Sequence, residues 1–119
     1  MTTKVSPMRG EIWDVDLNPT KGAELSKIHP VVVVGSDALR SLPLRLVAPI
    51  TGWKDSFAGK ISHVRIDPNE SNGLSKCSAV DTLQLRGVAI ERFKTKRGFL
   101  SIEEMEGIVC AIAAVVEYQ

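Results

Sequence analysis

A histidine at the mouth of a strongly hydrophobic segment is the first candidate for chemistry in this chain. Residues 26–35 read SKIHPVVVVG, so that His29 directly precedes Pro30 and four valines. The valines indicate a strand buried on both faces. A titratable imidazole at the start of such a strand can exchange a proton near neutral pH, as acid–base catalysis requires. The alternative interpretation is a turn residue that happens to precede a proline.

A second candidate is a local excess of positive charge. The segment RGVAIERFKTKRG (residues 86–98) has Glu91 as its only acid. Its basic residues are Arg86, Arg92, Lys94, Lys96 and Arg97. Because the net charge of the chain is only +1, a generally basic nucleic-acid coat is excluded, whereas binding of a polyanion to one face is not. The alternative is a solvated loop beside the acidic start of the next helix.

Several other classes of active site are absent from the sequence. It contains no glycine-rich phosphate loop, no HExxH and no GxSxG. With only two histidines and no Cys or His pairs at metal spacing, we expect neither a metal site nor a cofactor. Cys77 and Cys110 lie far apart and form no CxxC, so both are predicted to be free thiols in a reducing compartment.

Length and composition favour one globular domain over residues 1–119. This length suits a single hydrophobic core and is short for two. No segment approaches the roughly 20 apolar residues of a membrane span. The opening MTTKVSPMRGE lacks the apolar stretch of a secretory signal, so a cytoplasmic location is expected.

The elements that would position these residues follow from the hydrophobic pattern. Alternating or continuous apolar residues predict strands at 11–17, 30–35, 44–50, 60–67 and 78–85. The third of these is expected to stop at Pro49. Polar, turn-rich loops are expected at 18–27 and 68–76.

The last segment, residues 101–118, is predicted to be a helix. Ser101 and Glu104 have the spacing of a capping box, in which each side chain satisfies a free backbone donor of the other residue. Apolar residues recur at helical spacing. The stripe is widened by the small residues Cys110, Ala113 and Ala114. Such a helix is expected to pack on its own sheet and also on a partner. Five or six short strands and one helix indicate a small, curved antiparallel sheet or barrel.

Several segments together resemble the MazF/PemK family of toxin endoribonucleases. The segment RGEIWDVDLNPTKGAELSKIHPVVVVGSD resembles the opening of these proteins. That opening runs from R-G-[ED]-[IV]-W through a D-x-x-P-T-x-G-x-E loop to a basic residue and P-V-V-V. The segments VAPIT, NGLSKCSAVDTLQLR and RGFLSIEEMEGI follow in the family's order. The likeness covers about Met8 to Val116.

This resemblance implies a fold, a reaction and partners. The fold would be mainly β with a C-terminal helix, an SH3-like small barrel with an antiparallel curved sheet (the MazF/PemK/CcdB-like toxin fold). The protein would be a homodimer that cleaves single-stranded RNA at short sequences without a metal. Because the 2'-hydroxyl of the RNA is then the nucleophile, the products would be a 2',3'-cyclic phosphate and a 5'-hydroxyl. A cognate antitoxin would hold it inactive, with an acidic tail in the RNA groove.

The resemblance also implies catalytic residues. Thr51 matches the threonine that ends the third strand, and Glu24 matches the acid of the family's loop and would orient residue 29. The family's arginine before P-V-V-V is missing, and His29 occupies its position. An arginine grips two phosphate oxygens and stays charged, whereas a histidine makes one contact but can transfer a proton. His29 is therefore compatible with an impaired clamp, with a true acid–base catalyst, or with an inactive copy, either native or engineered.

Further residues are expected to line the RNA groove. Trp53 and Phe57 lie in a loop with Lys54, and they would stack bases if exposed or close the end of the barrel if buried. The remaining candidates for RNA binding are Arg9, Asp81, Gln84 and Arg86. His63 is interpreted as a residue of the sheet surface.

Two other functions remain open at this stage. One is a toxin of the same fold that binds a topoisomerase and cleaves nothing. Glu24 and Thr51 argue against it, because a pure binder needs no such pair. The other is a non-catalytic RNA-binding protein, which the departure at His29 permits.

Overall fold

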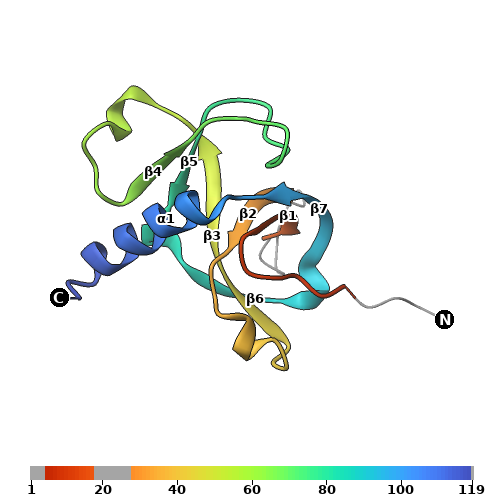
Figure 1. The fold of residues 1–119 in the computed structure, drawn as a ribbon. Coiled ribbons are helices and arrows are strands. Elements are labelled where there is room, and N and C mark those ends of the chain that lie inside the picture. Colours follow the sequence, from red (N-terminus) through yellow and green to blue (C-terminus); the bar gives the residue numbers. More distant parts are fainter. Residues whose placement is uncertain (1–4, 18–27, 119) are drawn as a thin grey trace, which may run out of the picture.

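The computed structural model describes residues 5–17 and 28–118, so the candidate Glu24 lies outside the described residues. Within that part of the chain, seven strands precede one α-helix, where five or six strands were expected (Figure 1). The strands are β1 (Glu11–Asp16), β2 (Ile28–Val33), β3 (Leu44–Gly52), β4 (His63–Ile66), β5 (Ser78–Asp81), β6 (Arg86–Ala89) and β7 (Phe93–Phe99). The helix is α1 (Ile102–Val115). The strand order is β4-β5-β3-β2-β1-β7, with β6 also on β3, and all the pairs are antiparallel, which confirms the predicted fold class.

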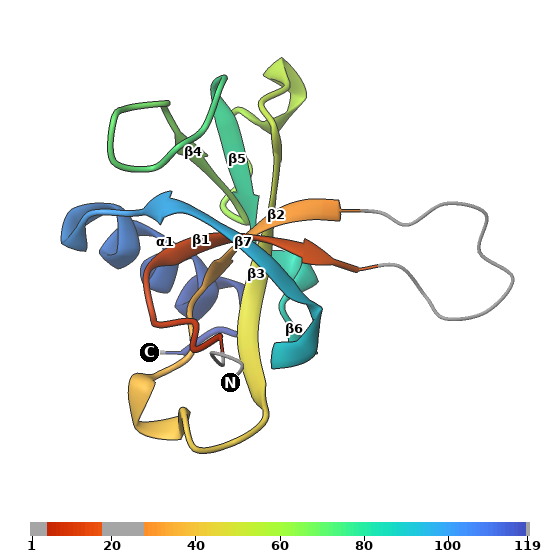
Figure 2. The same ribbon diagram turned by 90° about the vertical axis from the view of Figure 1, so that its right-hand side faces the viewer.

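Strand β3 joins the two halves of this sheet. It pairs with β2 and β6 along one part of its length and with β5 along the other, and Figure 2 shows it running between the β6 end and the β4–β5 end of the molecule. The prediction that this strand stops at Pro49 is wrong. Pro49 pairs with Val31 at the end of the β2 ladder, and Ile50 pairs with Val80 at the start of the β5 ladder. A residue without an N–H donor is tolerated there because the strand is changing partners.

Strand β2 begins at Ile28, so His29 lies inside the strand and not before it as expected. His29 stands opposite Val15 of β1. Pro30 is tolerated because the ladder between β2 and β3 begins only at the next residue.

The four valines are buried on both faces, as predicted. Val32 and Val34 belong to a hydrophobic cluster that includes Met105 and Ile108 of α1. The opposite cluster is formed by Val15, Val31, Val33, Val47, Val88 and Phe93. The first strands are therefore enclosed by the helix on one side and by β6 and β7 on the other.

The basic segment 86–98 is not a solvated loop, because it forms β6 and most of β7. Val88 and Phe93 are buried. The charged residues between and after them either face outward or contact other protein groups. Lys96 pairs with Glu11 at 3.0 Å, and Arg97 approaches Asp14 at 3.4 Å. The strand was not predicted because the segment contains many charged residues. Outward positions of a half-buried strand tolerate such residues.

The strand predicted at 78–85 ends earlier than expected. Asp81 is the last residue of β5, and Thr82–Gln84 form a short 3-10 helix. The Asp81 carboxylate accepts a hydrogen bond from the backbone N–H of Leu83 at 3.0 Å, which stabilises this turn. The strand predicted at 60–67 is likewise shorter, because β4 covers only His63–Ile66.

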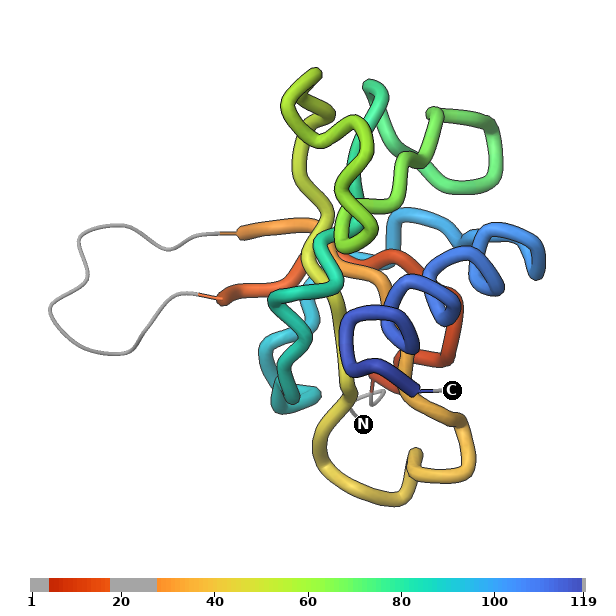
Figure 3. Tube along the Cα trace, turned by 90° about the vertical axis from the view of Figure 1, so that its left-hand side faces the viewer, coloured from red at the N-terminus to blue at the C-terminus, as the bar shows by residue number. Residues whose placement is uncertain are grey.

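Helix α1 lies along one side of the sheet (Figure 3). The predicted capping box is present: the Ser101 hydroxyl accepts from the Glu104 N–H at 3.0 Å, and the Glu104 carboxylate accepts from the Ser101 N–H at 2.8 Å. Met105, Ile108 and Ala111 are buried. The apolar residues Ile102, Val109 and Val116 remain exposed, so the helix has more apolar surface than its own sheet covers.

The two cysteines are free, as predicted. Burial raises the pKa of the Cys77 thiol, and a hydrogen bond from this thiol to Asp67 raises it further. Among the described residues, no helix is long and apolar enough to cross a membrane.

Candidate functional site

A pocket of about 500 Å³ opens where β2, β3 and β5 meet. We call it the main pocket. It contains most of the residues singled out from the sequence: His29, Thr51, Phe57, Asp81, Gln84 and Arg86. Leu17, Pro49 and His63 complete its lining among the described residues.

His29 and Thr51 come from β2 and β3, just beyond the end of the ladder that pairs these two strands. His29 lies in the part of β2 that precedes its pairing with β3, and Thr51 lies in the part of β3 that has left β2 to pair with Ala79 of β5. Both side chains are partly exposed. The divergence of β2 and β3 after Pro49 therefore leaves these two polar side chains at an open edge.

A second hollow, of about 260 Å³, shares His29 and Thr51 with the main pocket. We call it the side pocket. Its polar lining consists of His29, Thr51, Ser75, Lys76, Ser78 and Arg97, and none of the described residues that line it is acidic. His29 and Thr51 thus stand between two hollows with different chemistry.

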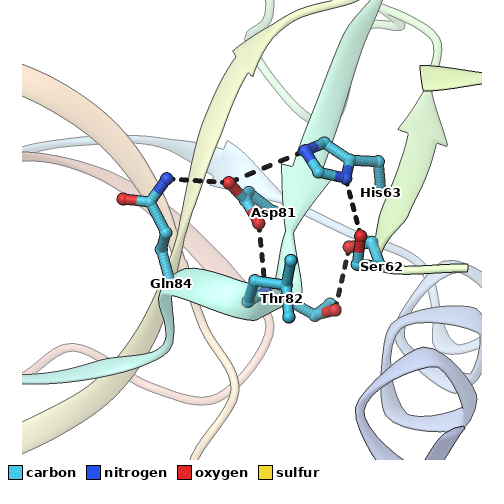
Figure 4. Close-up of polar contacts among 6 residues, drawn as sticks. Ser62, His63, Asp81, Thr82 and Gln84 are labelled. Atoms are coloured by element: carbon cyan, nitrogen blue, oxygen red, sulfur yellow. Dashed lines mark hydrogen bonds and ion pairs between the residues drawn. The ribbon is translucent and has the colours of Figure 1, made fainter. Parts of the chain in front are cut away.

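His63 is part of the main pocket, although sequence reasoning placed it on the sheet surface. Its Nδ1 lies 2.8 Å from the Ser62 hydroxyl, and its Nε2 lies 3.7 Å from Oδ2 of Asp81 (Figure 4). The same Oδ2 accepts a hydrogen bond from Gln84 at 2.9 Å. Both members of the His63–Asp81 pair are largely buried, with side-chain exposures of 10% and 12%. Asp81 is thereby held between a histidine and an amide.

Aromatic rings extend the pocket wall. Phe57 stacks on His63 with 4.2 Å between ring centroids, and Trp53 and Phe57 form a T-shaped pair with 5.7 Å between their centroids. The Arg65 guanidinium lies 5.4 Å from the Trp53 ring. Trp53 and Phe57 are both half-buried, which lies between the exposed and buried states considered for them, and their stacking on RNA bases stays a prediction.

Three of the predicted RNA-binding residues lie outside the lining of the main pocket. Trp53 contacts the ring of Phe57 but does not line the pocket. Lys54 is exposed at the start of the short 3-10 helix Asp55–Phe57. Arg9 lines a different hollow beside α1, where its Nε donates to the carbonyl of Val34 at 3.3 Å. The proposed link from Glu24 to residue 29 stays a prediction.

His63 and Lys76 line the two pockets although sequence reasoning assigned neither to the site, and Arg97 was singled out only as part of the basic segment. His63 alternates with Val64 and Ile66, which is a sheet-surface signal, and its partner Asp81 is 18 positions away in the sequence. The pairing of β4 with β5 places His63 directly opposite Asp81. The pairing of His63 with Asp81 could be recognised only once the register of β4 and β5 was known. No group of three or more His, Cys, Asp or Glu side chains is placed to hold a metal ion in the described part of the chain.

Comparison with known families decides the relationship. Residues 8–116 match the family described as "PemK-like, MazF-like toxin of type II toxin-antitoxin system". The chain belongs to this family. The resemblance inferred from the sequence segments is therefore confirmed, over the range that they covered.

Individual relatives agree with this membership. The chain is 33% identical over 105 residues to the Endoribonuclease MazF of Staphylococcus saprophyticus, an alignment covering 87% of this chain and 86% of that protein. Its fold resembles MazF in a MazE-MazF structure from Deinococcus radiodurans, with a TM-score of 0.78, 16% identity and coverage of 98% and 100% of the two chains. It also resembles a mycobacterial endoribonuclease in complex with its cognate antitoxin, with a TM-score of 0.76, 17% identity and coverage of 95% and 97%. These family members share the predicted mainly β fold with a C-terminal helix.

Proposed function

We propose that this toxin is a sequence-selective endoribonuclease that cleaves single-stranded RNA without a metal ion. One observation carries the proposal: His29 and Thr51, which come from different strands, line the same pocket together with Asp81, Gln84 and Arg86. This arrangement combines a group that can transfer a proton, a hydroxyl donor and a cation around a space large enough for part of an RNA strand. The name of the 33% identical relative supports the same reaction.

The proposed chemistry is transesterification within the RNA. A base removes the proton of a 2'-hydroxyl, whose oxygen attacks the adjacent phosphorus while the bond to the 5'-oxygen breaks. An acid protonates the leaving oxygen, which yields a 2',3'-cyclic phosphate and a 5'-hydroxyl. His29 is the proton-transfer group in this scheme. The Thr51 hydroxyl donates to a phosphate oxygen, and Arg86 stabilises the negative charge that develops on the phosphate.

Two protein partners belong to the proposal. A second copy of the chain covers the exposed apolar residues of α1, which the chain's own sheet leaves uncovered. A cognate antitoxin blocks the main pocket with an acidic segment, since a pocket that attracts phosphates also attracts carboxylates. The structures of relatives named with an antitoxin or with MazE support this second partner. An antitoxin peptide and an uncleavable RNA should then compete for the protein.

The test is cleavage of a long, unstructured RNA in excess chelator, with the ends of the products mapped. We expect cuts at one short sequence, each leaving a cyclic phosphate and a 5'-hydroxyl. The matched variant is Thr51→Val, which retains the β-branched shape, removes the hydroxyl and should slow cleavage. RNA binding without cuts would instead support a non-catalytic RNA-binding protein. Loss of both, together with inhibition of a topoisomerase, would support the non-cleaving toxin.

A further inference from the structure

Two basic side chains, those of Lys76 and Arg97, line the side pocket together with His29 and Thr51. The proposed chemistry uses His29 and Thr51 but neither of the two basic residues. We propose that the side pocket is the subsite for a backbone phosphodiester of the RNA, held by Lys76 and Arg97 beside the bond that is cut. This inference rests on the proposed function. It extends that function by stating where a neighbouring phosphate binds and which residues bind it.

The charge of the side pocket favours an anion. Lys76 and Arg97 line it, the hydroxyls of Thr51, Ser75 and Ser78 add possible donors, and none of the described residues in its lining is acidic. The main pocket differs, because it contains the Asp81 carboxylate. When one RNA phosphate contacts both His29 and Thr51, the next phosphate of the strand would therefore bind more favourably in the side pocket than in the main pocket.

Lys76 is positioned by a glycine. A Cβ atom built on Gly52 would lie 3.2 Å from the Lys76 Nζ, so the ammonium group lies over the backbone of the residue that follows Thr51. Glycine at position 52 leaves this space free, and a Cβ there would require the lysine to shift by a few tenths of an ångström. Lys76 and Thr51 both line the side pocket.

Arg97 is held in place with donors to spare. Its Nη2 donates to the carbonyl of Gly73 at 3.0 Å, and its Nη1 lies 3.4 Å from Asp14. A guanidinium carries five N–H groups, so donors remain for a phosphate. The Arg97 side chain is 29% exposed, which leaves it accessible from the pocket.

The loop between β4 and β5, which contains Lys76, is hydrogen-bonded to β7, the strand that contains Arg97. The buried Asn72 accepts from the N–H groups of Asn69 and Leu74 and donates to the carbonyl of Asp67, which closes the loop on itself. The N–H of Phe99 donates to the carbonyl of Ser71 at 2.9 Å.

Two glycines allow this close contact between loop and strand. A Cβ on Gly98 would collide with the Ser71 carbonyl, and one on Gly73 would collide with the Arg97 carbonyl. Gly73 also has a positive φ of 67°. The loop that precedes Lys76 and the strand that carries Arg97 are therefore fixed against each other.

The subsite also bears on the missing arginine. Histidine at position 29 contacts a phosphate at one point, whereas the arginine of the family resemblance would grip it at two. Lys76 and Arg97 flank the same position and supply fixed positive charge that does not depend on the protonation of His29.

The experiment measures RNA binding apart from cleavage. The probe is a single-stranded oligonucleotide with the sequence mapped in the cleavage assay, made uncleavable by a 2'-deoxy group at the attacking nucleotide. We expect Lys76→Met and Arg97→Met each to weaken its binding roughly tenfold to a hundredfold, as the loss of a charged hydrogen bond implies. Each should also lower the slope of log affinity against log salt by about 0.7. Lys94→Met is the matched control, because Lys94 is exposed on the same strand as Arg97 and lines neither pocket.

Two further measurements identify the contact. Replacing single phosphates of the probe by neutral methylphosphonates should reveal one position that weakens binding to the unmodified protein but not to Lys76→Met. Gly52→Val, whose larger side chain would fill the space that the Lys76 ammonium group occupies, should weaken binding in the parent and have no effect in the Lys76→Met background. Melting temperatures identify any variant that folds poorly. If Arg97→Met is unfolded, Lys76→Met decides.

Several outcomes would overturn the subsite. Cleavage by the parent protein with unchanged RNA binding in Lys76→Met would reject it and leave the proposed function intact. Weaker binding of an acidic antitoxin peptide, with RNA binding unchanged, would assign the side pocket to the antitoxin instead. Failure of the parent protein to bind or cut any RNA would reject the proposed function and the subsite with it.

Discussion

At the scale of single residues, His29 is the position where a substitution should increase activity. His29→Arg would restore a two-point charged contact beside Thr51, which lines the same pocket. We expect faster RNA cleavage by roughly ten- to hundredfold, because one preorganised donor to the transition state is worth about a hundredfold or more. The initial cleavage rate of a labelled RNA measures this.

The pH dependence of the same two proteins separates the roles of His29. If the imidazole transfers a proton, cleavage by the parent should vary between about pH 5 and 8, and this variation should be lost in His29→Arg. A parent that cleaves rapidly and an arginine variant that is slower would contradict the clamp argument and identify His29 as a catalyst suited to this fold.

His63 is the residue whose role depends most on its neighbours. His63→Phe would retain the stacking on Phe57 but remove the ring nitrogens near Ser62 and Asp81. Asp81 would then lose its neighbouring ring nitrogen in the pocket proposed to bind RNA, and we expect RNA to bind about tenfold more weakly. Binding titrations of an uncleavable RNA test this, with Asp81→Asn as the partner variant. A loss of the same size in the Asp81→Asn background would show that His63 does not act through Asp81.

At the scale of elements, Glu11 fastens β1 to its neighbours. Its carboxylate accepts from the Met8 N–H and from Trp13 Nε1, both at 2.9 Å, and pairs with Lys96 of β7 at 3.0 Å. Partial burial by itself would raise the pKa of Glu11, but the contacts with Trp13, Met8 and Lys96 outweigh it, so the pKa is lowered. The ionised carboxylate therefore stabilises the folded state.

The sign of this shift predicts how stability depends on pH. A lowered folded-state pKa gives stability that is fully present above the ordinary value of 4.5 and is lost as the pH falls below it. We expect Glu11→Gln to lower the melting temperature by roughly 2–5 °C at pH 7. The difference from the parent should shrink on acidification below about pH 4.5. Circular dichroism melts across this range measure it, with Glu70→Gln in an exposed loop as control, and a difference independent of pH would refute the assignment.

At the scale of the whole molecule, the exposed side of α1 predicts association. Ile102 is 78% exposed and Val109 is 42% exposed, although both belong to the apolar stripe of the helix. We expect light scattering at micromolar concentration to give twice the chain mass of 13.0 kDa. The double variant Ile102→Glu, Val109→Glu should shift the protein toward the monomer, because two buried charges per copy would oppose contact. Leu39→Glu, at an exposed leucine outside α1, is the control. A parent that is monomeric would reject the proposed dimer.

Local sequence determined those elements whose signals lie within a few residues. The alternation of β1, the two-faced burial of the valines in β2 and the capping box of α1 were all predictable, because period and capping depend on near neighbours. The family membership could also be predicted from the sequence, because several segments that match the family occur in the family's order. The sequence likewise identified His29 and Thr51 as candidates, and both line the main pocket.

Only the tertiary structure decided how distant segments meet. The passage of β3 through Pro49 depends on a change of pairing partner, and β7 is formed by its ladder with β1, which brings Lys96 near Glu11 and Arg97 near Asp14. His63 and Arg97 entered the site in the same way, through the pairing of β4 with β5 and the packing of a loop against Gly98. Strand register and close backbone contact are set by residues far apart in the chain, so no local pattern encodes them.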